Sequence, residues 1–445
     1  MSARISVIIP VYNAESHLRQ CLAKLRDSLD APFECIVVDD GSTDRSAAVA
    51  RQFGALVLST EGRRGPACAR NIGARVAKGE ILLFVDSDVC VHPETLSQVS
   101  AEFISHPEID ALMGSYDPQP SAPNFMSQYR NLMHHYVHQI GKHEATSFWA
   151  GCGAVRRETF LEFGGFDEVY RTPAIEDIEF GYRLAAAGRR IRLCNHIQCT
   201  HLKNWSARGM LKTDFFYRAL PWSELTLRSG QMPNDLNLRI SQRISVALAC
   251  LLGGLAAWSA IKGGAFFLFP LFVTFFILLA YFWLDYSGPK RQVISSMMVA
   301  VMGAIALLAY ERRLLMTIPL VLLAWVALFT RHRYAYPYSS WHRRSGAIVG
   351  GYCFAVLAFV WIFLPVHPMG TVFLVVLLAL VALNKQFYLF LAGARGKLFA
   401  LAAIPFHLLY FASSGMAFLL ASIRLPLGFG VRSPGAPQKA KAAAR

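Results

Sequence analysis

The chain has 445 residues, of which 54% are hydrophobic and only 16% are charged. This composition excludes a wholly soluble protein, and nearly all acidic residues precede residue 235 whereas the long apolar segments follow it. The formal net charge of +15 does not predict nucleic-acid binding, because no basic run interleaves with aromatic residues. A cytoplasmic membrane surface is the expected electrostatic partner. The nine cysteines form no C-x-x-C pair, which fits a reducing cytoplasm.

Up to about residue 120, apolar runs typical of buried strands alternate with segments of helical apolar spacing. The expected strands cover residues 4–11, 33–40, 55–60 and 80–88, and the expected helices cover 14–29, 43–53, 65–77 and 92–105. Continuous apolar strands joined by helices predict a mainly parallel sheet with helices on both faces.

Carboxylates follow two of these strands. Asp39 and Asp40 come after the second strand, and Asp86 and Asp88 come directly after the fourth. In such sheets ligands bind at the carboxyl ends of the strands. An Asp-Ser-Asp sequence there offers hard oxygen ligands for Mg²⁺ or Mn²⁺. A D-x-D sequence by itself is a weak signal, since two acids can also simply cap a strand.

Five motifs occur in a fixed order: "ISVIIPVYN", "VVDDGSTD", "GPACARNIG", the strand-terminal "DSD" and "IEDIEFGYRLAAAG". Together they resemble the family 2 inverting glycosyltransferases of GT-A fold, over roughly residues 4–205. The resemblance implies a Rossmann-like α/β domain over residues 1–205 that binds a nucleotide-sugar donor. An all-α polytopic membrane domain is expected to follow it.

On the nucleotide side, the resemblance implies that Pro10, Val11 and Tyr12 line the pocket and that Asp39 binds the uracil. An Asp accepts a hydrogen bond from the imide N–H of uracil, which cytosine lacks. Arg70 would assist at the base or the diphosphate as a planar cation.

On the metal side, the resemblance implies that Asp88 is the main ligand of Mg²⁺ or Mn²⁺. Asp86 would contact the ribose or the metal, and His201 would be a third ligand. The segment "CNHIQCTH", residues 194–201, also contains two cysteines and two histidines. A zinc site is not expected there, because no loop separates the ligand pairs.

The general base implied by the resemblance is Asp177, with Glu176 beside it on the acceptor side. A carboxylate there would take the proton of an acceptor hydroxyl that attacks the anomeric carbon opposite the leaving group, with inversion. An alternative stays open, because acids in the first turn of a helix also interact favourably with the helix dipole.

Further acceptor-side candidates are Trp149, Gly151 and Gly153 in "SFWAGCGAVRR", which resembles the acceptor loop of the family. A glycine-rich structural turn explains the same residues equally well. Trp222, in "RALPW", would touch the acceptor or anchor at the headgroup level. The Q-x-x-R-W signature of processive synthases is missing there.

The second half of the chain predicts membrane association. Residues 206–243 are expected to form basic, amphipathic helices on the membrane surface, and residues 423–445 a basic disordered tail. About seven spans are expected within 244–422, at 244–261, 264–284, 293–310, 314–330, 346–365, 369–384 and 397–422. With the catalytic domain in the cytoplasm, an odd number of spans puts the basic tail outside, against the positive-inside rule. Either the tail is an exception or the segment around Pro405 is re-entrant.

The sequence thus predicts a multi-pass enzyme of the inner membrane that transfers a sugar, from a donor expected to be UDP-linked, to a lipid or lipid-linked acceptor. Two alternatives remain: a processive polysaccharide synthase with a membrane channel, and a non-enzymatic scaffold with a degenerate transferase domain. A nicotinamide-dependent oxidoreductase would need G-x-G-x-x-G after the first strand, where this chain has "PVYNAE".

Overall fold

The computed structural model describes residues 5–28, 32–261 and 368–428. These residues fall into two compact units. The first unit contains residues 5–28, 32–247, 389–394 and 407–428, and the second contains 248–261, 368–388 and 395–406.

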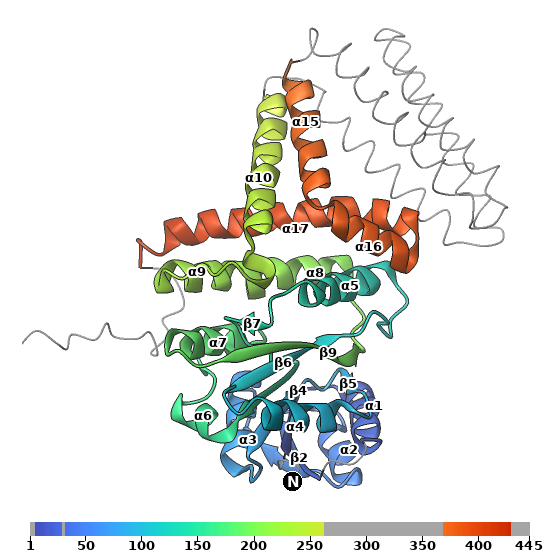
Figure 1. Ribbon diagram of the computed structural model, residues 1–445, viewed down its shortest axis with the longest axis vertical. Helices are drawn as coiled ribbons and strands as arrows, with labels where there is room; N and C mark the ends of the chain where they lie inside the picture. Colours follow the sequence, from blue (N-terminus) through green and yellow to red (C-terminus); the bar gives the residue numbers. More distant parts are fainter. Residues whose placement is uncertain (1–4, 29–31, 262–367, 429–445) are drawn as a thin grey trace, which may run out of the picture. The chain divides into compact units, whose positions relative to one another are not determined.

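A single mixed β-sheet forms the centre of the first unit (Figure 1). Its strands are β1 (Ile5–Val11), β2 (Phe33–Asp39), β3 (Leu56–Ser59), β4 (Ile81–Val85), β5 (Val89–Val91), β6 (Ala111–Tyr116), β7 (Glu144–Ala145), β8 (Cys152–Arg156) and β9 (Ile191–His201). Their order is β3-β2-β1-β4-β8-β6-β9-β5, and β7 pairs with β9.

The half of the sheet that carries the N-terminal strands is parallel, as predicted. β1 pairs in parallel with both β2 and β4, in registers that set Val11 opposite Asp39 and Ile8 opposite Phe84. The other half is mixed, because β8 runs antiparallel between β4 and β6 while β6 and β9 are parallel. The pairing of Val85 with Cys152 brings the loop before β8 to the end of β4, where the D-x-D sequence begins.

Helices cover both faces of this sheet, and each face has its own apolar core. Alternate residues of β1 supply the two cores, since Ile5, Val7 and Ile9 face one side and Ile8 the other. The first core is closed by α1 (Glu15–Arg26), α2 (Ser46–Gln52) and α4 (Thr95–Ser105). The second is closed by α3 (Pro66–Val76), α6 (Arg157–Glu162) and α7 (Glu176–Ala186). The predicted helices and strands up to residue 105 are confirmed to within a few residues at their ends.

The segment expected on the membrane surface is helical from residue 207 to residue 229. It consists of α8 (Ala207–Lys212), a π-helical stretch η1 (Thr213–Ala219) and α9 (Leu220–Ser229). A short 3₁₀ turn η2 (Leu236–Leu238) precedes α10 (Ile240–Ile261). Another helix of this unit, α5 (Phe125–Gln139), packs on β6 and β9.

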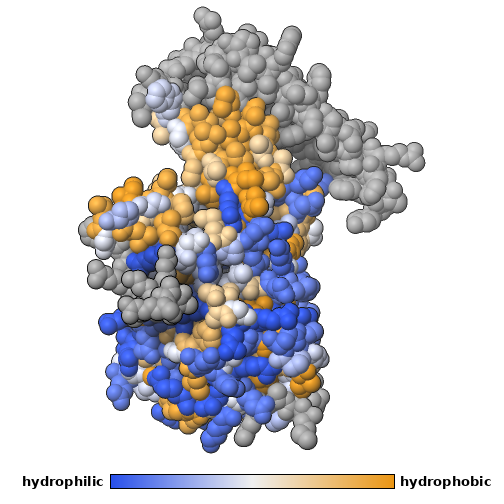
Figure 2. Space-filling view, turned by 60° about the vertical axis from the view of Figure 1, so that its left-hand side comes forward, coloured by the Kyte–Doolittle hydropathy of each residue, from blue (hydrophilic) through white to orange (hydrophobic). Residues whose placement is uncertain are grey.

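Two helices in the described part of the chain are long and apolar enough to cross a membrane. They cover Ile240–Trp258 in α10 and Lys397–Arg424, which is α17. The helices α15 (Pro368–Leu383) and α16 (Lys385–Arg395) could add one bent span. Figure 2 shows apolar side chains gathered on α10 and α15, and mostly hydrophilic ones over the sheet domain. The expected spans at 264–284, 293–310, 314–330 and 346–365 lie outside the described residues.

The loop that leads into α3 depends on a buried carboxylate and a glycine. Asp40 accepts hydrogen bonds from the backbone N–H of Arg64 at 2.7 Å and of Gly65 at 2.9 Å. Gly65 has a φ of +97°, and a Cβ there would lie 2.4 Å from the carbonyl oxygen of Arg171. Since α3 carries Arg70, this tight turn sets the position of a site residue.

Replacement of Gly65 by alanine is therefore expected to destabilise the protein strongly. Gly54 is the matched control, because it also has a positive φ of +76° but a Cβ there would meet no atom within 4 Å. Gly54→Ala should cost about 1–2 kcal/mol for the backbone conformation alone, and Gly65→Ala should cost at least twice as much because backbone must also move. Thermal unfolding of the detergent-solubilised full chain measures both, and equal midpoints for the two variants would contradict this steric account.

Candidate active site

A buried arginine joins the two acidic motifs of the sequence. Arg70 lies on α3, with only 6% of its side chain exposed. Its Nη2 atom lies 2.6 Å from Oδ1 of Asp86, and its Nη1 atom lies 2.8 Å from Oε1 of Glu176. A guanidinium carries donors on more than one nitrogen, so one cation can satisfy a carboxylate at the end of β4 and another at the start of α7. The two flanking carboxylates raise the pKa of Arg70 although burial opposes this, so the group stays charged.

The D-x-D acids differ in their surroundings. One third of the Asp86 side chain remains exposed, and its backbone N–H donates to the carbonyl of Gly151 at 3.3 Å. Asp88 lies with Oδ2 3.7 Å from Nε2 of His201. Burial disfavours the charged form of Asp88, but His201 and Lys203 outweigh it and lower the pKa of Asp88 to about 2. Asp88 is therefore an anion at neutral pH.

Asp177 begins α7 next to Glu176, as the acidic first turn of that helix. Its Oδ2 accepts a hydrogen bond from the backbone N–H of Ala150 at 3.0 Å, and its Oδ1 accepts one from its neighbour Ile178 at 2.8 Å. Burial, and then the negative charge of Glu176, raise the pKa of Asp177 to about 7. A carboxylate with that pKa is ionised about half the time at neutral pH, which suits a general base.

The loop of residues 149–153 connects Asp177 to the D-x-D acids, because Ala150 binds Asp177 and Gly151 binds Asp86. A Cβ at Gly151 would lie 2.5 Å from the ring of Trp149. A Cβ at Gly153 would lie 2.2 Å from the carbonyl oxygen of Trp149. The chain itself requires both glycines, which favours the structural explanation of this motif. Contact of either glycine with an acceptor stays a prediction.

The expected nucleotide pocket lies at the carboxyl end of β1 and β2. Pro10 and Val11 end β1, and Tyr12 follows it with 38% of its surface exposed. The guanidinium of Arg63 lies 4.2 Å from the centre of the Tyr12 ring. Asp39 uses Oδ1 to accept the backbone N–H of Ser42 at 3.0 Å. An exposed aromatic ring, a cation and a carboxylate with a second oxygen thus meet at this edge.

No motif in the sequence singles out Tyr116, yet its ring lies at the centre of the site. It stacks on His201 at 4.3 Å between centroids, and it contacts Trp149 at 4.8 Å and His134 at 4.5 Å. Burial is the main cause that lowers the pKa of His134 far below its usual value, and it lowers the pKa of His138 to about 4. These histidines are therefore neutral, and with Trp149 and Tyr116 they form an aromatic wall.

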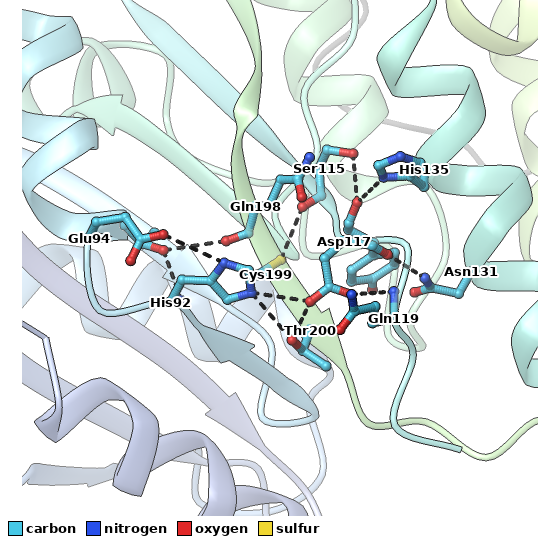
Figure 3. Close-up of polar contacts among 12 residues, drawn as sticks. His92, Glu94, Ser115, Asp117, Gln119, Asn131, His135, Gln198, Cys199 and Thr200 are labelled. Carbon is cyan, nitrogen blue, oxygen red and sulfur yellow. Dashed lines mark hydrogen bonds and ion pairs between the residues drawn. The ribbon is translucent and has the colours of Figure 1, made fainter. Parts of the chain in front are cut away.

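Figure 3 shows a polar network around Asp117 and His135, the residues whose contacts hold the backbone at the end of β6. Nδ1 of His135 lies 2.6 Å from the carbonyl oxygen of Tyr116, and Asn131 donates to the carbonyl of Asp117 at 2.7 Å. The carboxylate of Asp117 lies 3.1 Å from Nε2 of His92 and accepts a hydrogen bond from the hydroxyl of Thr200. The network links the ends of β5, β6 and β9 to α5. Asp117 follows β6 directly, so the rule that selected Asp39 and Asp86 could also have selected it.

The residues present fit a divalent cation. Mg²⁺ is usually held by one or two carboxylates together with waters and substrate phosphates. Asp88 and the free oxygen of Asp86 supply such carboxylates, and the 3.7 Å between Asp88 and His201 suits two ligands of one cation. Within the described ranges, no three His, Cys, Asp or Glu side chains already gather as a closed metal site. The assignment of Asp86, Asp88 and His201 to a metal therefore stays a prediction.

Comparison with known proteins assigns a class to this domain. Residues 6–164 match the family described as Glycosyl transferase family 2. The mixed sheet with helices on both faces is the GT-A fold that the sequence predicted. Residues 6–164 are therefore similar to the glycosyltransferase domains of family 2.

Individual relatives match over part of their length. An "Uncharacterized glycosyltransferase" of Haemophilus influenzae is 31% identical over 192 residues, which are 40% of this chain and 61% of that protein. A validoxylamine A glucosyltransferase of Streptomyces hygroscopicus subsp. limoneus is 28% identical over 263 residues, 49% of this chain and 57% of the relative. The match thus spans about three fifths of each of these relatives. Among solved structures, the mannosyltransferase PcManGT from Pyrobaculum calidifontis, in complex with GDP-Man and Mn²⁺, is 22% identical with a TM-score of 0.48, covering 69% of this chain and 87% of that one.

The pKa of Asp177 predicts the pH dependence of the activity. Only the ionised carboxylate accepts a proton, so kcat/KM should rise with pH around a midpoint near 7. Glu176→Gln removes the neighbouring negative charge, so the pKa of Asp177 and the midpoint should both move to lower pH. Asp177→Asn should lose activity by about 10²–10⁴-fold.

Nucleotide binding is the control in this experiment, and it should persist in Asp177→Asn. If the midpoint of the rise of kcat/KM with pH is the same in Glu176→Gln as in the wild type, a group other than Asp177 titrates. Full activity of Asp177→Asn would remove Asp177 from the mechanism.

Proposed function

We propose that this protein is a membrane-associated, metal-dependent, inverting glycosyltransferase that transfers a sugar from a nucleotide-sugar donor to a lipid or lipid-linked acceptor. The observation that carries the proposal is the bridge of Arg70 between Asp86 and Glu176. This bridge sets a carboxylate with a pKa of about 7, Asp177, beside the acids at the end of β4.

The proposed reaction is a single displacement. The hydroxyl oxygen of the acceptor forms a bond to the anomeric carbon of the donor sugar, and the hydroxyl proton passes to Asp177. The bond from the anomeric carbon to the phosphate oxygen breaks, and its electron pair leaves with the nucleoside diphosphate. Because attack and departure occur on opposite faces, the anomeric configuration inverts.

In this proposal Asp88, Asp86 and His201 hold a Mg²⁺ or Mn²⁺ ion. Such an ion, when bound, neutralises the negative charge that develops on the departing diphosphate. The low pKa of Asp88 supports this role, since a metal ligand must be deprotonated. Burial raises the pKa of Asp86, and Arg70 opposes this rise and orients the carboxylate through a contact of 2.6 Å.

A uridine-linked donor is the one we favour. Oδ1 of Asp39 accepts a hydrogen bond from the backbone N–H of Ser42. Oδ2 remains to accept a hydrogen bond from the imide N–H of uracil. Tyr12 offers an exposed ring beside it, and Arg63 covers that ring. Pro10 and Val11 would close the pocket from the end of β1.

Turnover assays test the function directly. We expect the detergent-purified chain to release nucleoside diphosphate from one member of a panel of UDP- and GDP-sugars, only with Mg²⁺ or Mn²⁺, and faster with a native lipid extract. The rate of nucleoside diphosphate release should fall at least about 10²-fold in Asp88→Asn, because the substitution weakens the metal site. Asp27→Asn is the control variant, since Asp27 is an exposed residue whose carboxylate lies 3.8 Å from Lys24.

Each alternative has its own outcome. Equal release with and without lipid would contradict a lipid acceptor and favour a soluble one. Long polymeric products would indicate a processive synthase. No release from any donor, together with no metal-dependent nucleotide binding, would leave the scaffold.

The position of the catalytic domain at a membrane is part of the proposal. We place the chain in the inner membrane as a multi-pass protein with its catalytic domain in the cytoplasm. Support comes from α10, which follows the surface helices directly and is long and apolar enough to span. Phe216, in the surface segment, is 58% exposed and available to lipid.

The position of α17 decides on which side of the membrane the C-terminus lies. The C-terminal half of α17 belongs to the catalytic unit, where Ala417 and Ala421 pack with Leu220 of α9 and Nε of Arg424 lies 3.9 Å from Oε1 of Glu224. On the opposite face, Met416, Leu419 and Ile423 are each at least 60% exposed. We infer that this half of α17 lies along the membrane surface beside α9 rather than across the bilayer. The basic tail then stays in the cytoplasm, in agreement with the positive-inside rule.

Protease protection tests this topology. With one epitope tag at each terminus, both tags should be cleaved in inverted membrane vesicles and both should be protected in right-side-out vesicles. Cleavage of the C-terminal tag in right-side-out vesicles alone would show that α17 crosses the membrane. The N-terminal tag reports vesicle orientation and serves as the internal control.

A further inference from the structure

The helical segment 207–229 is tied to the catalytic domain at two points. Asp214, in its π-helical part, lies 2.6 Å from Nη2 of Arg130 on α5, and both side chains are at most 10% exposed. Trp222, on α9, donates from Nε1 to the hydroxyl of Tyr182 on α7 at 3.0 Å. π-helical stretches are rare and often occur at functional sites. The side chains between these two contacts are therefore candidates for a functional role.

Arg218 lies midway between the anchors. It is four residues after Asp214 and four before Trp222, and helical residues four apart share one face. Arg218 therefore faces the catalytic domain, between α5 and α7. Its side chain is nevertheless exposed, and it makes no hydrogen bond or ion pair with any residue that the structure describes. A charged group on an inward face that remains open to solvent is available to a ligand.

Both cationic and acidic groups surround Arg218. Desolvation by the surrounding protein atoms, and then the positive charge of Arg130, lower the pKa of Arg218, whereas Asp214, Tyr116 and Asp177 act in the opposite direction. Asp214 is already paired with Arg130 at 2.6 Å. Arg218 is thus left without an ion pair of its own among the described residues, while the charge of Asp177 acts on it from a distance.

This cation lies on the acceptor side of the site. The basic groups that act on Asp88 are His201, Lys203 and His17, which belong to the proposed metal and diphosphate region. Arg218 instead interacts with Asp177 and Tyr116. A donor diphosphate bound at Asp88 would therefore lie near Lys203 and the proposed metal, and Arg218 would remain free for the second substrate.

We propose that Arg218 binds a phosphate group carried by the acceptor and so positions the acceptor hydroxyl at Asp177. The inference rests on the proposed function and narrows its acceptor to a phosphate-bearing molecule. A guanidinium binds phosphate through two parallel hydrogen bonds, which fix orientation as well as distance. Phosphates also occur at the headgroup level, where the segment 207–229 would lie against the membrane.

Binding of simple alkyl phosphates tests this inference without any need for turnover. We expect dodecyl phosphate to bind the full chain in an uncharged maltoside detergent, as measured by calorimetry, and dodecanol not to bind. Arg218→Gln should weaken dodecyl phosphate binding at least about 10-fold, since a charged hydrogen-bonded pair is lost. Arg218→Lys should have an intermediate affinity for dodecyl phosphate, because a lysine keeps the positive charge but cannot form the two parallel hydrogen bonds of a guanidinium. Arg51→Gln, which removes an exposed charge on α2, should match the wild type.

Kinetics then assign the phosphate to a substrate. Arg218→Gln should raise the KM of the native lipid acceptor and leave the donor KM and nucleotide binding unchanged. Inhibition by inorganic phosphate as strong as that by dodecyl phosphate would indicate a soluble phosphate ester rather than a lipid phosphate, within the same inference. Unchanged dodecyl phosphate binding in Arg218→Gln, or a raised donor KM instead of acceptor KM, would overturn it. If alkyl phosphate binds through Arg218 but no donor turns over, the proposed function fails and the phosphate site stands.

Discussion

The structure of the site depends on one buried ionic interaction, that of Arg70 with Asp86 and Glu176 at 2.6 and 2.8 Å. A buried charge is costly unless it is paired and hydrogen-bonded, so the three groups require one another. The pairing ties the end of β4 to the start of α7 through α3. These segments are far apart in the sequence, and the bridge gives the two acidic motifs one fixed geometry.

The same bridge divides the acids of the site into different roles. Arg70 compensates Asp86 and Glu176, whereas Asp177 receives mainly backbone N–H groups and has a pKa of about 7. Asp88 lies near cationic groups and has a pKa of about 2. Carboxylates whose surroundings separate their pKa values in this way are suited to different tasks, one to hold a cation and one to exchange a proton.

A second set of contacts relates the catalytic domain to the helices that follow it. Arg130 with Asp214, and Tyr182 with Trp222, hold the segment 207–229 against α5 and α7. The C-terminal half of α17 packs along α9 in the same unit. The C-terminal half of this apolar helix is thus part of the first unit, although the composition of the whole helix is that of a membrane span.

Apart from the short strand β5, the order of strands and helices over the first 105 residues could be predicted from the chain alone, because buried parallel strands and amphipathic helices leave distinct apolar periods. The three residues of β5 are too few to show a period, and they pair with β9 about a hundred residues later. Asp86 and Asp88 could be selected as acids that follow a buried strand. Asp177 is selected through the family resemblance, because its place at the start of a helix has an explanation of its own. The folded chain was needed to see that Arg70 joins two acids, that Tyr116 stacks on His201, and that Arg218 is left unpaired on an inward face. Such facts depend on which side chains meet across strands and helices distant in the sequence, and no local pattern encodes that.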